Sequence, residues 1–291
     1  MNEIKLKARA KINISLDIVG KRENGYHDVE MIMQTINLYD DISLKKVETD
    51  DITIKTNLMY LPTDRKNLVY QIIEFMKKEY HISEGVYVDL FKRIPVAAGL
   101  AGGSSNGAQT ILGMNQLFEL NLSMDTMLEI GQKFGSDIPY CMISGTALAT
   151  GLGEKIELLD SFPVCNVVLI KPKFGVSTAT VYKNYRLDEE KPHPKTKELV
   201  EAIVHQNLDF ICDNLVNVLE SVTCRLHPEL IDYKEQLSLL GANGVLMSGS
   251  GPSIFALFKD RQLAQKACDF YKKNQQMQYV YLTTIYNVKR G

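Results

Sequence analysis

Apolar and polar residues alternate along the start of the chain, with an apolar residue at every second position from Ile4 to Ile18. A period of two is typical of a β-strand that buries one face. Because the run exceeds the usual strand length, we expect a bend or bulge near Ala8 and Ala10 and neighbouring strands on both sides. The polar face of this strand would carry Lys5, Lys7, Arg9, Lys11, Asn13 and Ser15.

The next segments predict a hairpin followed by alternating helices and strands. Asn24-Gly25 is a strong turn signal, so the first strand should return as a second strand. Ser104 and Ser105 should cap a helix that follows the glycines, and Gly135 should end another helix in a left-handed conformation. We expect strands at 28–38 and 85–94, helices at 67–80, after residue 103 and at 123–135, and a hairpin at 146–159.

After residue 164 the order of elements changes. Apart from a helical insertion, the order resembles a split β-α-β-β-α-β unit. A boundary at 160–164 fits the proline in this stretch, so we expect one domain over residues 1–162 and a second over residues 163–291. The second domain should contain strands at 165–172, 244–247, 254–258 and 278–288, a short helix at 177–186, a long helical region at 196–220 and a helix at 261–274.

Composition and charge narrow the class of protein. The 291 residues are 45% hydrophobic, enough for a packed core, and the net charge of -2 argues against a broad nucleic-acid surface. The chain has five cysteines and no C-x-x-C pair, which favours reduced thiols and a cytoplasmic location. It contains no long apolar run, so we expect no secretion signal and no membrane partner.

The stretch VAAGLAGGSSNGAQTI, residues 96–111, joins a predicted strand to a predicted helix. Gly99, Gly102 and Gly103 indicate a loop where bare backbone approaches another group closely, and a phosphate at the helix start is the obvious candidate. No lysine follows the glycines as in a P-loop, and the G-x-G-x-x-G spacing is absent. A cation that balances the phosphates must therefore come from elsewhere in the chain.

Three separated stretches, namely ARAKINISLDIVGKRENGYHDVEMIMQTI, RIPVAAGLAGGSSNGA with GSDIPYC, and VLMSGSGPSIFALF, resemble the signature regions of the GHMP small-molecule kinases. The resemblance implies an α+β two-domain fold, with a ribosomal protein S5 domain 2-like N-terminal domain and a ferredoxin-like C-terminal domain. A-K-I-N together with K-R-E-N-G-Y-H resembles the members that phosphorylate a cytidine diphosphate-linked methylerythritol at its 2-hydroxyl in the non-mevalonate isoprenoid pathway.

This resemblance implies ATP and Mg²⁺ as cofactors and assigns residues to the nucleotide. Asn67 and Leu68 match a family segment beside the adenine. Backbone N–H groups and serine hydroxyls of the glycine loop would hold the triphosphate, with the helix dipole in place of a loop lysine. The loop residues are Pro95, Val96, Ala97, Ala98, Gly99, Leu100, Ala101, Gly102, Gly103, Ser104 and Ser105.

The resemblance also assigns the phosphoryl-transfer step. Asp137 would orient the acceptor hydroxyl and accept its proton, while Lys11 would keep Asp137 ionised and offset charge on the moving phosphoryl group. Asn13, two positions along the same strand face, would help to orient the substrate. From the residues alone, Lys11 could equally be a solvated charge, and Asp137 the cap of a short helix with Pro139 in its first turn.

The remaining assignments concern the substrate. Tyr26 and His27 would stack on and hydrogen-bond the cytosine, and Tyr182 would cover its second face, although it could be an ordinary half-buried aromatic. Gly249, Ser250 and Gly251 match a motif that lies by the substrate phosphates in the family; the alternative is a tight connection between strands.

Two other functions fit the same residues. One is a sibling GHMP kinase that acts on a mevalonate derivative, homoserine or a sugar; the other is an inactive nucleotide-binding regulator. Retention of Lys11 and Asp137 argues against the regulator, and the G-Y-H segment argues against the siblings. Ala101 stands where many family members have glycine. The sequence allows a monomer or a homodimer.

Overall fold

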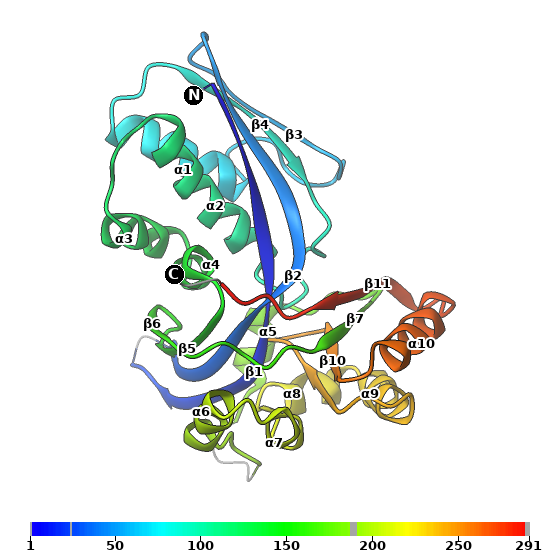
Figure 1. The fold of residues 1–291 in the computed structure, drawn as a ribbon. Helices are drawn as coiled ribbons and strands as arrows, with labels where there is room; N and C mark the ends of the chain where they lie inside the picture. Colours follow the sequence, from blue (N-terminus) through cyan, green and yellow to red (C-terminus); the bar gives the residue numbers. More distant parts are fainter. Residues whose placement is uncertain (1, 24, 187–190, 289–291) are drawn as a thin grey trace. The chain divides into compact units, whose positions relative to one another are not determined.

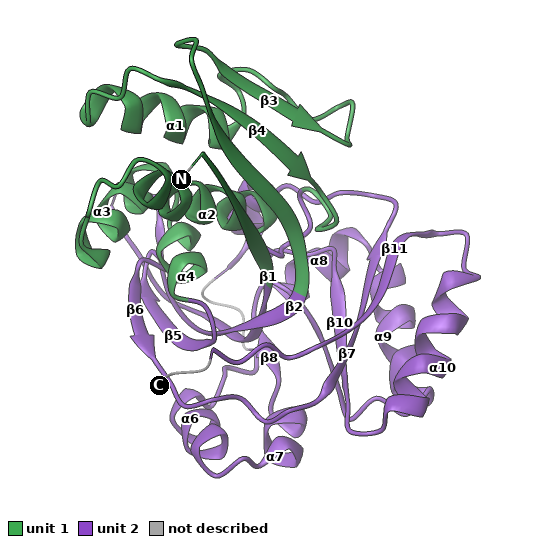
Figure 2. Cartoon of the chain, turned by 45° about the horizontal axis from the view of Figure 1, so that its top comes forward, with its two compact units in different colours: residues 1–10, 38–96, 101–143 green, residues 11–37, 97–100, 144–291 purple. Residues whose placement is uncertain are grey.

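The computed structural model describes residues 2–23, 25–186 and 191–288 and divides the chain into two compact units (Figure 2). The first unit comprises residues 1–10, 38–96 and 101–143, and the second comprises residues 11–37, 97–100 and 144–291. The long strands β1 (Glu3–Lys21) and β2 (His27–Val47) each contribute one part to each unit. The units are therefore interlaced in sequence, and the boundary expected between residues 162 and 163 remains a prediction.

In the first unit, helices cover one face of a sheet whose strand order is β3-β4-β2-β1 (Figure 1). Strands β2 and β4 are antiparallel, whereas β3 and β4 are parallel. A Cβ atom added to Gly113 would lie 2.6 Å from Leu44 Cδ1 and 2.8 Å from Leu6 Cδ1, so α2 packs directly on the sheet. The remaining elements are β3 (Ile52–Thr56), α1 (Leu68–Glu79), β4 (Gly85–Phe91), α2 (Gly102–Leu117), α3 (Met124–Phe134) and α4 (Asp137–Ile143).

The first unit confirms the predicted elements but corrects two of their ends. Helix α2 begins at Gly102, after Ala101 in the left-handed region (φ 53°), and no side chain caps it, so the prediction that Ser104 and Ser105 are caps is wrong. Both serines lie inside the first turn instead. Gly135 ends α3 with φ 167°, which is extended backbone, so the left-handed stop predicted there is wrong.

The second unit contains a sheet with the strand order β11-β7-β10-β9, in which every pair is antiparallel. This is the order of a split β-α-β-β-α-β unit, which confirms that prediction. Helices α9 and α10 bury Leu230, Leu237, Ala264 and Cys268 against the sheet. The elements are β7 (Asn166–Pro172), α9 (Glu229–Leu239), β9 (Gly244–Met247), β10 (Ile254–Phe258), α10 (Arg261–Lys272) and β11 (Met277–Thr284).

The rest of the second unit surrounds the parts of β1 and β2 that belong to it. Strand β2 pairs with the predicted hairpin of β5 (Thr146–Gly151) and β6 (Lys155–Leu158), and β1 lies between β2 and β8 (Val216–Asn217), as the prediction of neighbours on both sides requires. Asn24 of the predicted first turn lies outside the described residues. The short helix α5 spans Thr178–Asn184.

The prediction of one long helical region at 196–220 is wrong, because the region contains several short elements. It is divided into α6 (Thr196–Val204), α7 (Leu208–Asp213), strand β8 and the start of α8 (Glu220–Leu226). Asn207 starts α7 by accepting a hydrogen bond from Phe210 N at 3.1 Å, and Val216 pairs with Ser15 of β1. These contacts override the helical period. Within the described ranges, none of the helices has the length and apolar character needed to cross a membrane.

Candidate active site

Lys11 and Asn13 lie on a buried polar face of β1 in the second unit. Their side chains are 5% and 0% exposed, and Ile12 and Ile14 on the opposite face are also fully buried. Lys11 Nζ donates to Asn13 Oδ1 at 2.6 Å, and Asn13 Nδ2 donates to Met31 Sδ at 3.2 Å. The alternation predicted that β1 buries only one face, but this part of the strand is buried on both faces. Because Lys11 is buried, it is not a solvated charge, and its hydrogen bond to Asn13 supplies the polar partner that a buried charge needs.

Residues from the three signature regions meet in the second unit. Lys11 N donates to Leu100 O at 3.2 Å, and Ser248 Oγ donates to Gly99 O at 2.9 Å. A Cβ atom added to Gly249 would lie 3.3 Å from Gly99 Cα and 3.6 Å from Asn13 Oδ1. The A-K-I-N stretch, the glycine loop and the third motif thus lie within contact distance.

Gly99 is required by this contact between loops. Its φ is 74°, and a Cβ atom there would lie 2.1 Å from Ser248 O, a backbone atom that cannot move aside easily. The bare backbone at Gly99 therefore makes room for the protein's own third motif. The sequence indicated a phosphate as the group that approaches the backbone of Gly99, Gly102 and Gly103, whereas at Gly99 the approaching group is the backbone of Ser248.

The third motif is held in place by Asn217, which the sequence analysis missed. Asn217 is 5% exposed, and its Nδ2 donates to Met247 O and Gly249 O at 2.8 Å each. Ser250 is also buried and shares a hydrogen bond of 2.8 Å with Thr178 Oγ1 of α5. Gly251 has φ 79°, as a tight connection between strands requires. Both the structural alternative and the proposed phosphate contact fit this arrangement.

In the first unit, the start of α2 has the features of an anion site. Gly103 is exposed, and a Cβ atom there would have no neighbour within 4 Å, whereas one on Gly102 would lie 2.8 Å from Ile94 Cγ2. The first bond of the helix is donated by Ser105 N to Ala101 O at 2.8 Å, so the preceding N–H groups have no helical acceptor. Among the described residues, the buried Ser105 Oγ has no hydrogen-bond partner. Such a hydroxyl and such N–H groups fit a phosphate.

The other predicted loop residues differ in exposure. Val96 and Ala97 are exposed, Gly99, Ala101 and Ser104 are intermediate, and Pro95, Ala98 and Leu100 are buried. Ala97 and Ala101 both have positive φ, 51° and 53°. A left-handed conformation costs an L-residue roughly 1–2 kcal/mol, so this loop is strained at two positions that lack glycine.

Asn67 and Leu68 have structural contacts of their own. Asn67 is the N-cap of α1: its side chain accepts from Val69 N at 3.0 Å and donates to Pro62 O at 2.7 Å. Leu68 Cδ2 would lie 3.3 Å from a Cβ atom on Gly107, so it packs against α2. Their contact with adenine remains a prediction.

Asp137 is the first residue of α4, in the first unit, and is half-buried. A carboxylate in the first turn interacts favourably with the helix dipole. Pro139 lies in the same turn, where its missing N–H costs no hydrogen bond. This agrees with the helix start inferred from the residues alone and leaves the proposed proton acceptor a prediction.

His27 and Tyr182 lie together in the second unit, with ring centroids 5.5 Å apart and planes tilted by 41°. Burial, and secondarily the charge of Lys21, lowers the pKa of His27, so its imidazole is neutral at pH 7 and able to donate and accept. Tyr26 is 63% exposed. Because the two rings touch, a cytosine can enter between them only if one ring moves.

Among the residues that the structure describes, no three His, Cys, Asp or Glu side chains lie close enough together to bind a metal ion. A hard cation such as Mg²⁺ often keeps several waters and binds through substrate phosphates with few protein ligands. The site therefore fits a Mg²⁺ that arrives with the nucleotide better than a resident ion.

Comparison with known proteins decides the family. The sequence model described as GHMP kinases N terminal domain matches residues 67–145, and the one described as GHMP kinases C terminal matches residues 196–275. A protein of Lachnoclostridium phytofermentans named 4-diphosphocytidyl-2-C-methyl-D-erythritol kinase is 48% identical over 289 residues, which are 99% of both chains. The chain belongs to the GHMP kinase family.

Further comparisons agree with this assignment or share the fold. A relative from Bacillus licheniformis with the same name is 48% identical and covers 89% of this chain and 90% of its own. A crystal structure of 4-(cytidine 5'-diphospho)-2C-methyl-D-erythritol kinase superposes with TM-score 0.85 and 28% identity, covering 98% of this chain and 100% of that one. Homoserine kinase from Cytophaga hutchinsonii (TM-score 0.76, 20% identity, 98% of this chain and 95% of that one) shares the fold. The expected α+β GHMP kinase fold is confirmed.

Proposed function

We propose that this GHMP kinase transfers the γ-phosphoryl group of ATP to the 2-hydroxyl of 4-diphosphocytidyl-2-C-methyl-D-erythritol, giving the 2-phosphate. The reaction serves the non-mevalonate route to isoprenoid precursors. Relatives 44–48% identical to this chain over nearly its whole length carry the name of that kinase. We also propose a cytoplasmic location, which the five cysteines without a C-x-x-C pair support.

The observation that carries the proposal is the meeting of the three motifs around Asn13, Gly99 and Gly249 in the second unit. A tight strand connection alone would not need a buried lysine and a buried amide beside it. Lys11 and Asn13 are 5% and 0% exposed and are joined by a 2.6 Å hydrogen bond, so an ammonium group and an amide are held in fixed positions beside the third motif. A phosphorylated substrate is an anion that such a cation would attract.

We assign the proton acceptor and the cation to Asp137 and Lys11. Phosphoryl transfer requires positioning and charge stabilisation more than covalent chemistry. The carboxylate of Asp137 would orient the acceptor hydroxyl and take its proton. The ammonium of Lys11 would offset negative charge that develops on the transferring group. Asn13 holds the Lys11 ammonium through the 2.6 Å hydrogen bond and keeps it on the polar face of β1.

We assign the nucleotide phosphates to the start of α2. The backbone N–H groups of Gly103 and its neighbours and the Ser105 hydroxyl would bind the phosphate oxygens. Mg²⁺, when bound with the nucleotide, would neutralise part of the phosphate charge. Asn67 and Leu68 would lie beside the adenine.

We assign the cytosine to Tyr26, His27 and Tyr182. The neutral imidazole of His27 can form hydrogen bonds with the base, and the tyrosine rings offer stacking faces. Gly249, Ser250 and Gly251 would lie beside the substrate diphosphate. If so, a substrate that lacks cytosine leaves these polar groups without partners.

An assay of ATP consumption with a panel of acceptors tests the proposal. The cytidine-linked methylerythritol should be phosphorylated at least about 10³-fold more efficiently, by kcat/KM, than methylerythritol phosphate, mevalonate phosphate or homoserine. Efficient turnover of one of the other acceptors would indicate a sibling kinase. Nucleotide binding without turnover of any acceptor would indicate the regulator.

A further inference from the structure

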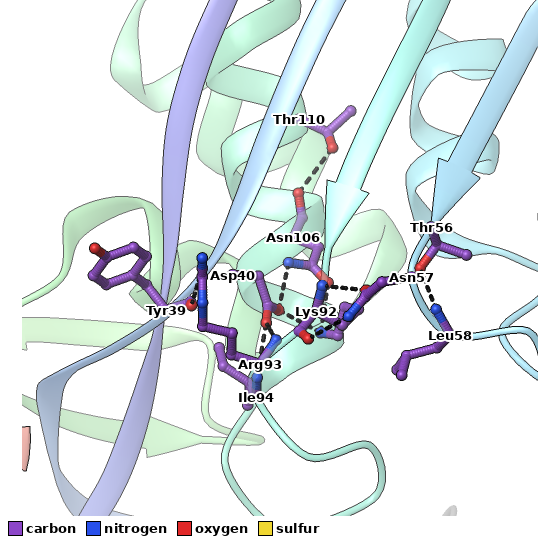
Figure 3. A network of polar contacts seen from close by, with 10 residues as sticks. All are labelled: Tyr39, Asp40, Thr56, Asn57, Leu58, Lys92, Arg93, Ile94, Asn106 and Thr110. Atoms are coloured by element: carbon purple, nitrogen blue, oxygen red, sulfur yellow. Dashed lines mark hydrogen bonds and ion pairs between the residues drawn. The ribbon is translucent and has the colours of Figure 1, made fainter. Parts of the chain in front are cut away.

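A buried polar network in the first unit joins the residues before the glycine loop to the first turns of α2 (Figure 3). At its centre, Lys92 and Asp40 form an ion pair whose side chains are 3% and 0% exposed. Lys92 Nζ also donates to Asn106 Oδ1 at 2.8 Å. The proposed chemistry does not use these residues. Because desolvation offsets much of the attraction in a buried ion pair, stability alone is a weak reason for its presence.

Asp40 connects two segments that flank the loop. Its Oδ1 accepts hydrogen bonds from Arg93 N at 2.7 Å and Ile94 N at 2.8 Å, which fixes the backbone where the chain enters the loop. Its Oδ2 accepts from Lys92 Nζ and from Asn106 Nδ2, the latter at 2.9 Å, which fixes the helix where the chain leaves the loop. One carboxylate on β2 therefore holds both ends (Figure 3).

Lys92 is itself held on both sides. Asn57 accepts from Lys92 N at 2.7 Å and donates to Lys92 O at 3.0 Å. At the other end of the side chain, Nζ lies 3.3 Å from the position of a Cβ atom on Gly102. The ammonium group therefore lies directly beneath the first residue of α2. Gly102 is needed here because any larger residue would displace Ile94 or Lys92.

We propose that Lys92, Asp40 and Asn106 form a clamp that positions the two ends of the glycine loop, residues 95–105, before a nucleotide binds. The inference rests on the proposed function, since it takes this loop as the site of the ATP phosphates. The loop contains two alanines with positive φ, and such a conformation persists only where the surroundings impose it. A loop ordered in advance loses less conformational entropy on binding. These three are positioning residues.

The variant Lys92→Met tests the clamp, because it keeps the length of the side chain and removes the ammonium group. In the nucleotide-free protein, amide hydrogen exchange over residues 93–96 and 101–106 should be about tenfold faster than in the wild type. KM for ATP should rise about tenfold, with kcat at saturating ATP within about twofold and KM for the acceptor alcohol unchanged. A purely structural role would lower the melting temperature without this split.

Lys171→Met is the matched control. Lys171 is 4% exposed, lies in the second unit and donates to Phe174 O at 3.0 Å and Gln278 Oε1 at 2.6 Å. The same chemical change at this site should leave exchange at residues 93–106 and KM for ATP as in the wild type. If Lys171→Met has the same effect as Lys92→Met, the clamp is refuted, because any buried lysine would then serve.

Asn106→Leu decides the question if Lys92→Met does not fold, because it cuts the link to α2 and leaves the ion pair intact. It should also raise exchange and KM for ATP, by about threefold or more. Wild-type exchange and ATP affinity in this folded variant would overturn the clamp. A wild-type chain that binds no ATP analogue would overturn the proposed function; the exchange rates alone would then support or refute the clamp.

Discussion

Asp137 starts helix α4 and is half-buried, so the effect of removing its charge can be measured without dismantling a core. We expect Asp137→Asn to lower kcat by roughly 10²- to 10⁴-fold, the usual range for a lost general base. ATP affinity should barely change, because the phosphates are assigned to α2. Steady-state kinetics with calorimetry of an ATP analogue measures both quantities. A folded variant with nearly wild-type kcat would leave Asp137 as a helix-start residue only.

Lys11→Ala should also lower kcat, since it removes the cation that offsets charge on the phosphoryl group. If Lys11 and Asp137 act in the same step, the double variant should resemble the worse single variant. Because Lys11 is buried, circular dichroism must establish that each variant is folded. Effects that multiply would instead indicate that the two residues act in separate steps.

The left-handed conformation of Ala101, with φ 53° at the N-cap of α2, should lower the stability of the folded protein by a measurable amount. Glycine adopts this conformation freely, and the relief of roughly 1–2 kcal/mol exceeds the added entropy of the unfolded chain, about 0.4–1 kcal/mol. We expect Ala101→Gly to raise the free energy of unfolding by about 0.5–1 kcal/mol, measured by urea denaturation. Ala98→Gly, in the same loop without a positive φ, should lower it. The opposite order would contradict the strain at Ala101.

At the scale of elements, the glycine loop and α2 place three glycines in three different environments. Gly99 lies against the backbone of Ser248, Gly102 against Ile94 and Lys92, and Gly103 has open space around it. Of these three glycines, Gly103 alone has open space beside its Cα atom, which leaves room for a phosphate at the start of the helix. Gly102 is therefore needed for the packing of α2 against Ile94 and Lys92, whereas Gly103 is available for binding a phosphate.

We predict opposite outcomes for the same substitution at these two positions. Gly103→Val should fold with little change in the free energy of unfolding, because the position is open. It should weaken ATP binding at least about tenfold, because the branched side chain covers the N–H groups. Gly102→Val should lower the free energy of unfolding by roughly 1–3 kcal/mol through overpacking. Thermal unfolding and calorimetry check both variants. Unchanged ATP affinity in folded Gly103→Val would place the phosphates elsewhere.

For the whole molecule, the sequence predicted regular elements well and the contacts that join them poorly. Alternation located the strands, and the order of elements in the second half predicted the β11-β7-β10-β9 sheet. The helical region at 196–220 failed because the pairing of Val216 with Ser15 is a distant contact that no local period contains. The missing caps at Ser104 and Ser105 depended on where the left-handed residue Ala101 lies.

The candidate site shows the same division. Lys11, Asp137 and the glycine loop were predicted as site residues because their motifs resemble a family, and their roles remain predictions. Asn217 and the network of Lys92 with Asp40 were missed, because each acts through a partner far away in sequence. No local feature of the sequence distinguished Asn217 from the other polar residues of the predicted helical region, or Lys92 from the exposed lysines. Residues of this kind can be recognised only from the folded structure, in which their distant hydrogen-bond partners lie beside them.

The identity of the product and the position of its new phosphate decide whether this chain phosphorylates the 2-hydroxyl of the cytidine-linked methylerythritol. The protein is incubated with ATP, Mg²⁺ and 4-diphosphocytidyl-2-C-methyl-D-erythritol, and the product is followed by ³¹P NMR with a ¹³C-labelled methylerythritol group. We predict one new phosphomonoester on the carbon of the 2-hydroxyl, an intact cytidine diphosphate, one ADP per product, and little product with Asp137→Asn. A phosphate on another hydroxyl, or ADP and free phosphate without a new ester, would contradict it.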